Sequence, residues 1–223
     1  MSRIVQRRGV RGSLKWIQSC VNAHPHALDT AILAQLPKAK TLTWRSPLVA
    51  DEFAEYRDGA FLARLGLDRL TSELAAFWPQ RGPQWDALGI SDAGDILLVE
   101  AKAHIDELCS PASAAKAEAS TALIRTSLAQ TVAALGATPK SNWIDTFYQY
   151  ANRLAHLHFL RSANVPAWLV LVNFIGDDEM GGPRTAREWE AAYRIVNHVL
   201  GIREKAPLMR RVLHVYPDVK ALV

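Results

Sequence analysis

Hydrophobic residues follow two spacings along the chain, and these spacings separate the predicted strands from the predicted helices. Residues 95–104 (DILLVEAKAH) form an aliphatic run that ends in charge, and residues 165–175 are almost entirely apolar. A short aliphatic run is typical of a strand, and a continuous apolar run is typical of a strand that is covered on both faces. We therefore predict strands in both segments, and a last strand at residues 211–217.

Other segments carry apolar residues at helical spacing, most of them preceded by Ser, Thr or Asn. The predicted helices cover residues 48–56 with a continuation at 61–67, residues 73–78, a long helix after the cap residues 110–113 that runs to Leu135, and residues 143–161 and 185–200. Gly136 and Gly201 stand where glycine commonly ends a helix. Residues 13–36 have mixed helical character. Strands and helices mixed in this way predict an α/β protein.

Residues 83–89 and 95–104 flank a turn-like segment, residues 90–94 (ISDAG), and this arrangement predicts a β-hairpin. With the turn near Asp92, the numbers of facing residues sum to about 185, which places Asp86 opposite or beside Glu100. Alternation along the second strand puts Glu100 and Lys102 on one face, together with His104. Opposed carboxylates destabilise paired strands, so this hairpin needs compensating cations: Lys102 is one, and a divalent metal is the obvious second.

An Asp on one strand followed by Glu-x-Lys at the end of the next resembles the catalytic hairpin of the PD-(D/E)XK nuclease superfamily. The matching residues are Asp86, Glu100 and Lys102, while Trp85 stands where the family often has Pro. The resemblance implies a restriction-endonuclease-like mixed central sheet flanked by helices. It also implies Mg²⁺, with Mn²⁺ as a substitute, held by Asp86, Glu100 and the carbonyl of Ala101, and a lysine that orients the attacking water. The alternative is a surface hairpin with a solvated Glu–Lys pair.

The same family usually places a Glu on a helix before the hairpin, where it reaches the metal. Glu52, Glu55 and Glu73 are the candidates, and the sequence does not choose among them. His104 shares the face of Glu100 and is a further accessory candidate that could orient the water.

The predicted helix at residues 143–161 carries a polar stripe. Asp145, Gln149, Asn152 and His156 are spaced so that they share one face, and Arg153 borders it. We predict that Gln149, Asn152, Arg153 and His156 bind substrate along a cleft. An ordinary solvated face is the alternative.

Composition changes this interpretation little. The chain of 223 residues carries a net charge of +4, with basic residues gathered near its start. We expect one nuclease-like domain over residues 1–223, with residues 1–45 as a basic extension and residues 184–223 as a helix–strand addition. With no membrane-length apolar run, no secretory signal pattern and two cysteines, we expect a cytoplasmic protein without a membrane partner.

The sequence therefore predicts a Mg²⁺-dependent phosphodiesterase that acts on DNA, with RNA and a homodimer left open. A catalytically silent nuclease-like domain that binds nucleic acid or a protein is the alternative. Other hydrolases are disfavoured, because the chain contains no Gly-x-Ser-x-Gly, Cys-x-x-Cys or His-Glu-x-x-His motif.

Overall fold

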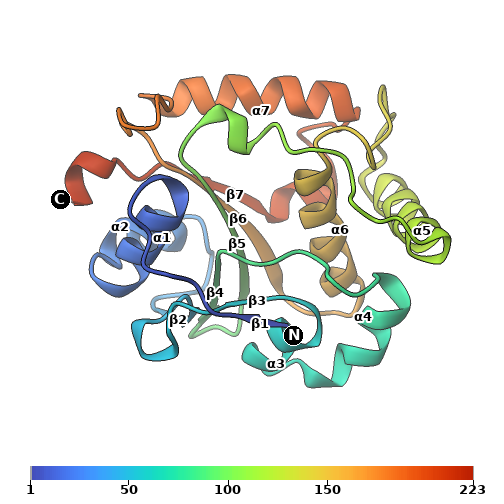
Figure 1. The fold of residues 1–223 in the computed structure, drawn as a ribbon, viewed down its shortest axis with the longest axis horizontal. Coiled ribbons are helices and arrows are strands. Elements are labelled where there is room, and N and C mark those ends of the chain that lie inside the picture. The colour runs from blue at the N-terminus through green and yellow to red at the C-terminus, as the bar shows by residue number, and fades with distance from the viewer. Residues whose placement is uncertain (1, 223) are drawn as a thin grey trace.

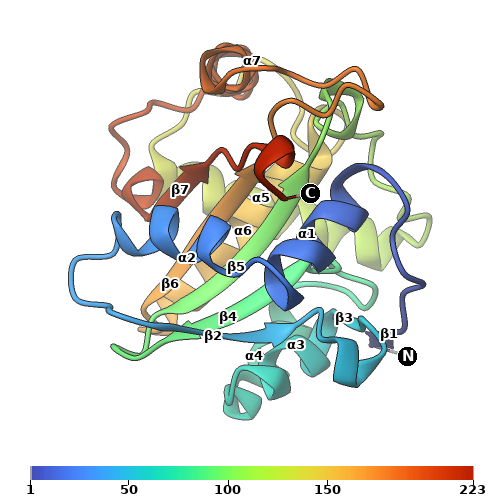
Figure 2. The same ribbon diagram turned by 90° about the vertical axis from the view of Figure 1, so that its left-hand side faces the viewer.

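The computed structural model describes residues 2–222, and at its centre lies a five-stranded mixed sheet (Figures 1 and 2). In spatial order its strands are β2 (Leu42–Ser46), β4 (Ala87–Ser91), β5 (Ile96–Lys102), β6 (Ala167–Asn173) and β7 (Val212–Val215). β2, β4 and β5 pair antiparallel, whereas β5, β6 and β7 pair parallel. The prediction of an α/β protein with a mixed sheet flanked by helices is confirmed at this level.

The β4–β5 hairpin is the predicted one. Ala87 faces Val99 and Ile90 faces Ile96, so the register extends to Asp86 opposite Glu100. β6 is buried along its whole length, as expected for a continuous apolar strand between two layers.

Helices cover both faces of the sheet. α1 (Gly12–Asn22) and α2 (His26–Leu33) lie on one face, and Trp16, Ile17 and Leu28 pack there against Leu97, Val99 and Ala101 of β5. The other face is covered by α3 (Asp58–Arg64), α4 (Thr71–Phe77), α5 (Glu118–Leu135), α6 (Tyr148–Ser162) and α7 (Ala186–Leu200). Figure 1 shows α1 and α2 on the left of the strands and α5 and α6 on the right. Within the described residues, no helix is both long and apolar enough to cross a bilayer.

Residues 48–56 do not form the predicted helix. A short 3₁₀ turn at Val49–Asp51 is followed by Glu52 and Phe53 with positive φ, and then by the strand β3 (Glu55–Tyr56). β3 pairs with β1 (Arg3–Ile4), and Tyr56 also bridges to Trp85. These long-range pairings override the local helical pattern, and the positive φ values end any helix here.

Two other helices begin later than predicted, at Glu118 for α5 and at Tyr148 for α6. The hydroxyl of Ser110 does not cap a helix that follows it; it accepts a hydrogen bond from the Gln149 backbone N–H at 2.9 Å. α7 is as predicted: Thr185 and Glu188 form a reciprocal cap at its start, and Gly201 with φ of 69° ends it.

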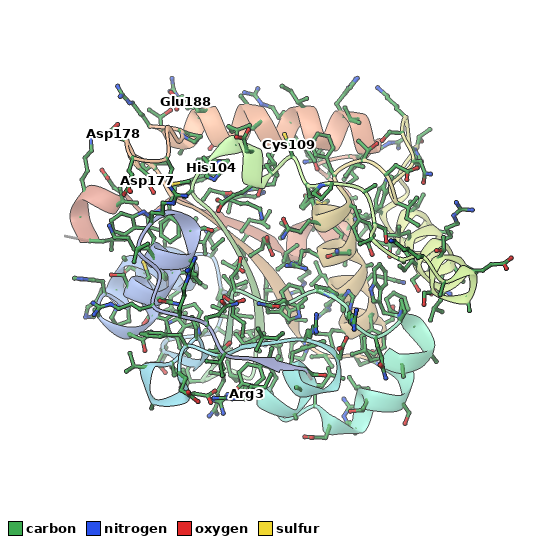
Figure 3. All side chains as sticks on the ribbon, in the orientation of Figure 1. Arg3, His104, Cys109, Asp177, Asp178 and Glu188 are labelled. Carbon is green, nitrogen blue, oxygen red and sulfur yellow. The ribbon has the colours of Figure 1, made fainter. Side chains whose placement is uncertain are left out.

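Residues 1–45 contain α1 and α2, and the loop after β6 is tied to them. The indole of Trp16 donates to the buried carboxylate of Asp177 at 2.6 Å. Figure 3 labels Asp177 beside Asp178, which lies at the surface and pairs with Arg184 and Lys220. The N-terminal helices are therefore part of the packing around the sheet. The division of the chain into one domain with additions stays a prediction.

Candidate active site

Three carboxylates and a lysine converge at the C-terminal end of β5. They line a pocket of about 610 Å³ between β5, the N-terminal half of α6 and the segment that follows β5. Its polar lining residues are Ser13, Glu55, Gln84, Asp86, Glu100, Lys102, Asp106, Glu107, Ser110, Tyr148, Gln149, Asn152 and Arg153. The pocket joins the predicted hairpin residues to one of the three candidate upstream glutamates.

Glu55 reaches this pocket because β3 lies beside the start of the hairpin. The Trp85 N–H donates to the Tyr56 carbonyl at 3.0 Å, which fixes β3 next to residues 84–86. The carboxylate of Glu55 is 4% exposed and accepts hydrogen bonds from the side-chain amides of Gln6, at 3.0 Å, and Gln84. Burial and the nearby charge of Glu100 raise its pKa, although the two amides and Arg153 act in the opposite direction.

Asp86 precedes β4 and points toward the end of β5. Its carboxylate accepts the backbone N–H of Ala101 at 2.7 Å. The N–H and C=O of a strand residue face the same side, so the Ala101 carbonyl is also directed to this edge. Burial raises the pKa of Asp86 well above its usual range, and the charges of Glu100 and Glu55 raise it further. Asp86 therefore carries its charge at an energetic cost.

Glu100 is the best-compensated of the three acids. One carboxylate oxygen accepts Lys102, and the other accepts Nε of Arg153 at 2.5 Å. Burial alone would raise the pKa of Glu100, but the charges of Arg153 and Lys102 outweigh it and the net shift is downward. Glu100 is therefore ionised, although it is only 3% exposed.

α6 supplies one of the two positively charged side chains, Arg153, and the partner of the other, Gln149. The Lys102 ammonium donates to the side-chain oxygen of Gln149 at 2.6 Å. Arg153 donates to the Gln84 carbonyl at 2.7 Å and to the Asn152 side chain at 3.0 Å, and it lies over the ring of Trp85 at 4.8 Å. The guanidinium is fixed on several sides, so its geometry is preorganised.

The donor set fits a hard divalent cation. Glu55, Asp86 and Glu100 offer oxygen ligands, which Mg²⁺ and Mn²⁺ prefer. These three acids stand against only two positively charged side chains, Lys102 and Arg153. The charges of Glu55 and Glu100 disfavour a negative charge on Asp86, and a bound cation would relieve this repulsion. In this arrangement of the described residues, no three His, Cys, Asp or Glu side chains already form a metal-binding group.

The structure brings only some of the predicted accessory residues to this pocket. Glu52 is exposed and pairs with Arg3 at 3.1 Å, and Glu73 is exposed on α4. His104 lies in the segment after β5 (Figure 3), and its ring is 3.8 Å from Glu107, with which it caps the next turn. None of these three lines the pocket.

His156, a predicted substrate-binding residue, does not line this pocket; it lines a separate one together with Trp78 and Arg81. It is 2% exposed and packs edge-on against the rings of Phe61, Phe77, Trp78 and Trp85. It shares a stripe with Gln149 but lies seven residues, or about 10 Å, further along the axis. Burial lowers the pKa of His156 to about 3, so the ring is neutral.

Sequence reasoning gave no role to Gln6, Gln84 or Glu107. Gln84 lies within the predicted hairpin, so its place beside the site could be predicted. Gln6 reaches Glu55 only through the pairing of β1 with β3, which no local pattern encodes. Glu107 accepts from the Ala103 N–H at 2.5 Å and from Ser13 of α1 at 2.7 Å, so it ties the pocket rim to the N-terminal helices.

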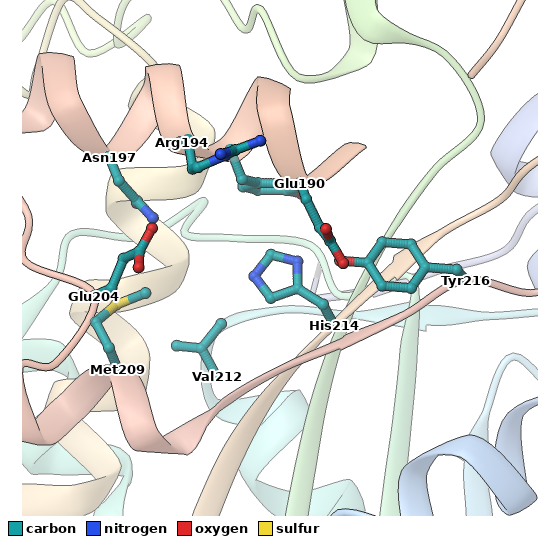
Figure 4. A pocket seen from close by; sticks show the side chains of 9 residues that line it. Glu190, Arg194, Asn197, Glu204, Met209, Val212, His214 and Tyr216 are labelled. Carbon is teal, nitrogen blue, oxygen red and sulfur yellow. The ribbon is translucent and has the colours of Figure 1, made fainter. Parts of the chain in front are cut away.

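The polar face of the sheet continues beyond Lys102. Asn173 is its register partner on β6 and is fully buried; its amide donates to the Leu171 carbonyl at 3.1 Å and to His214 at 3.4 Å. His214 lines a second pocket of about 420 Å³ between β7 and α7 (Figure 4). Burial lowers the pKa of His214 to about 4, so this pocket has a neutral imidazole at its floor.

Comparison of the chain with protein-family models, with curated proteins and with solved structures finds no match.

Proposed function

We propose that this chain is a metal-dependent nuclease that hydrolyses phosphodiester bonds, with DNA as the expected substrate, on a restriction-endonuclease-like sheet. The observation that carries the proposal is the convergence of Glu55, Asp86, Glu100 and Lys102 in one open pocket. Acids that repel one another beside a buried lysine are costly to stability, and such groups concentrate at functional sites.

Glu55, Asp86 and Glu100 would hold the divalent cation, with the Ala101 carbonyl directed to the same edge. When bound, the cation supplies a Lewis acid and a more acidic water at the phosphate. Burial and the neighbouring acids raise the pKa of Asp86 and so oppose its ionised form, and a bound cation would offset that opposition. Arg153 holds Glu100 in place and keeps it ionised.

Lys102 is the residue suited to contact the phosphate. Its ammonium bonds Glu100 and Gln149, so two partners aim it at the end of β5. A fixed positive charge in this pocket stabilises the charge that builds on a phosphorane. Gln149 acts as the positioning residue for this ammonium.

A cleavage assay tests the proposal. Single- and double-stranded DNA and RNA are incubated with Mg²⁺ or Mn²⁺ and the wild type, Asp86→Asn, Glu100→Gln or Lys102→Met. Each substitution is expected to lower the rate about a hundredfold or more. Glu73→Gln is the matched control, because this acid is exposed and lies outside the pocket. Wild-type activity that persists in Lys102→Met would contradict the role of the lysine.

One observation favours a second candidate, a silent nuclease-like domain that binds nucleic acid or a protein. Both oxygens of Glu100 are already engaged by Lys102 and Arg153. If these bonds persist when metal is added, Glu100 cannot ligate it. This candidate predicts no cleavage by the wild type and no Mg²⁺ binding in calorimetry, with nucleic-acid or protein binding unaffected by Lys102→Met.

A further inference from the structure

A pocket of about 640 Å³ lies at the opposite end of the sheet from the carboxylates. It is lined by Arg161 at the end of α6, Trp168 of β6, and Arg210 and Arg211 of the 3₁₀ turn Pro207–Arg211 that leads into β7. Its other walls are formed by Pro37, Ala134, Ser162, Pro207 and Leu208. We call it the arginine pocket, because three of its lining residues are arginines and none is acidic.

Two of these guanidinium groups are held in place. Arg211 lies over the ring of Trp168, with its Cζ 4.5 Å from the ring centroid. Arg161 donates through Nη1 to the Val165 carbonyl at 3.0 Å, which leaves its other donors available. Side chains that are already ordered lose less conformational entropy when they bind a ligand.

The positive charge of the arginine pocket is not balanced by nearby carboxylates. No carboxylate in the described part of the chain lies within ion-pair distance of Arg161, Arg210 or Arg211. The charge of Asp95 acts on Arg161, but this carboxylate already accepts hydrogen bonds from Ser91 and from Trp168. Burial, and then the charge of Arg211, lower the pKa of Arg161. An anion placed between these two arginines would relieve their repulsion.

We propose that the arginine pocket binds a phosphate group. Planar guanidinium forks match the oxygens of phosphate in a bidentate way, and a doubly charged oxyanion balances three arginines better than a single carboxylate does. This inference does not rest on the proposed nuclease activity.

The bound phosphate is distinct from one held at Lys102. Residues 96 and 102 mark the two ends of β5, and six strand residues span about 20 Å. The phosphate could therefore belong to a nucleic acid that extends from one end of the sheet to the other, or to a small phosphorylated molecule.

Calorimetry with inorganic pyrophosphate tests the proposal, at constant ionic strength and with EDTA so that no metal site contributes. The wild type is compared with Arg161→Gln/Arg211→Gln, and with Arg210→Gln/Arg211→Gln, which spares the bond from Arg161 to Val165. The matched control is Arg187→Gln/Arg203→Gln, which removes two exposed arginines from elsewhere. Circular dichroism and thermal melts establish that each variant is folded.

The proposal predicts saturable binding to the wild type, weakened at least tenfold in both pocket variants and less than twofold in the control. No saturable binding, or equal weakening in the control, would overturn it. Binding of a labelled oligonucleotide, measured in the same buffer, shows whether the bound phosphate belongs to a nucleic acid or to a small molecule. Weaker oligonucleotide binding by the pocket variants assigns the phosphate to nucleic acid. Unchanged oligonucleotide binding with lost pyrophosphate binding assigns it to a small molecule.

Discussion

Helix α6 carries two clusters of buried polar side chains that differ in how their burial is tolerated. At its start, Arg153 and Gln149 face Glu100 and Lys102, and the charges remain because each has a partner. Less than one turn beyond Arg153, His156 lies among aromatic rings with one hydrogen bond, to the Asn152 carbonyl at 2.9 Å, and burial leaves it neutral. Burial alone therefore does not mark a functional residue; a buried cluster that holds more acids than cations is the better indicator.

The largest expected effect is the loss of stability when the Arg153–Glu100 ion pair is broken. Arg153→Met leaves Glu100 with Lys102 alone and adds to the excess of negative charge. We expect the free energy of unfolding to fall by about 3–5 kcal/mol, as measured by urea denaturation. The exposed Arg125→Met is the control and should change stability by less than about 0.5 kcal/mol. Adding Glu100→Gln to Arg153→Met should recover part of the loss; a fully additive double variant would argue against a coupled pair.

The burial of His156 should make the stability of the protein depend on pH. The pKa of this ring is about 3 in the folded state and near 6.5 when it is unfolded. The unfolded state therefore binds more protons below pH 6.5, and stability falls as the pH drops from 6.5 toward 3. Between pH 7.5 and pH 5 the loss due to His156 is about 2 kcal/mol.

The check is the same titration on His156→Phe, which keeps an aromatic ring but cannot bind the proton. Its stability should decline less than that of the wild type over this interval. Parallel pH curves for the two proteins would show that His156 is not buried in its neutral form.

The smallest expected effect has the opposite sign. The raised pKa of Asp86 means that its ionised form opposes folding, so Asp86→Asn should stabilise the protein by about 1 kcal/mol at pH 8. The gain should shrink as the pH falls and Asp86 becomes protonated. Glu73→Gln is the matched control, with no significant change. A destabilised Asp86→Asn would show that the bond from Ala101 outweighs the charge repulsion.

The parts of the fold that follow from local chemistry could be predicted from sequence. The β4–β5 hairpin depends on a turn between two apolar runs, and α7 on a capping pair and a glycine. β3 could not be predicted, because its two residues are fixed by β1 and by Trp85, which lie far away in sequence. The first turn of α6 also involves a tertiary contact, the Ser110–Gln149 hydrogen bond, which local pattern does not encode.

The same division holds for the candidate site. Asp86, Glu100 and Lys102 lie on one hairpin, so strand alternation and register were enough to bring them together. The choice of Glu55 over Glu52 and Glu73 needed the β3 pairing. His156 was assigned to the site because helical spacing defines a stripe, but it does not say where along that stripe a pocket ends.

The central claim is that Glu55, Asp86 and Glu100 hold a divalent cation, and its most direct test is the effect of Mg²⁺ on unfolding. The free energy of unfolding is measured by urea denaturation of the wild type, Asp86→Asn and Glu73→Gln across a Mg²⁺ titration at constant ionic strength. A ligand at a hundred times its Kd stabilises the folded state by about 2.7 kcal/mol. We predict such a saturating gain for the wild type and Glu73→Gln, and none for Asp86→Asn. No gain in the wild type, or an equal gain in Asp86→Asn, would contradict the claim.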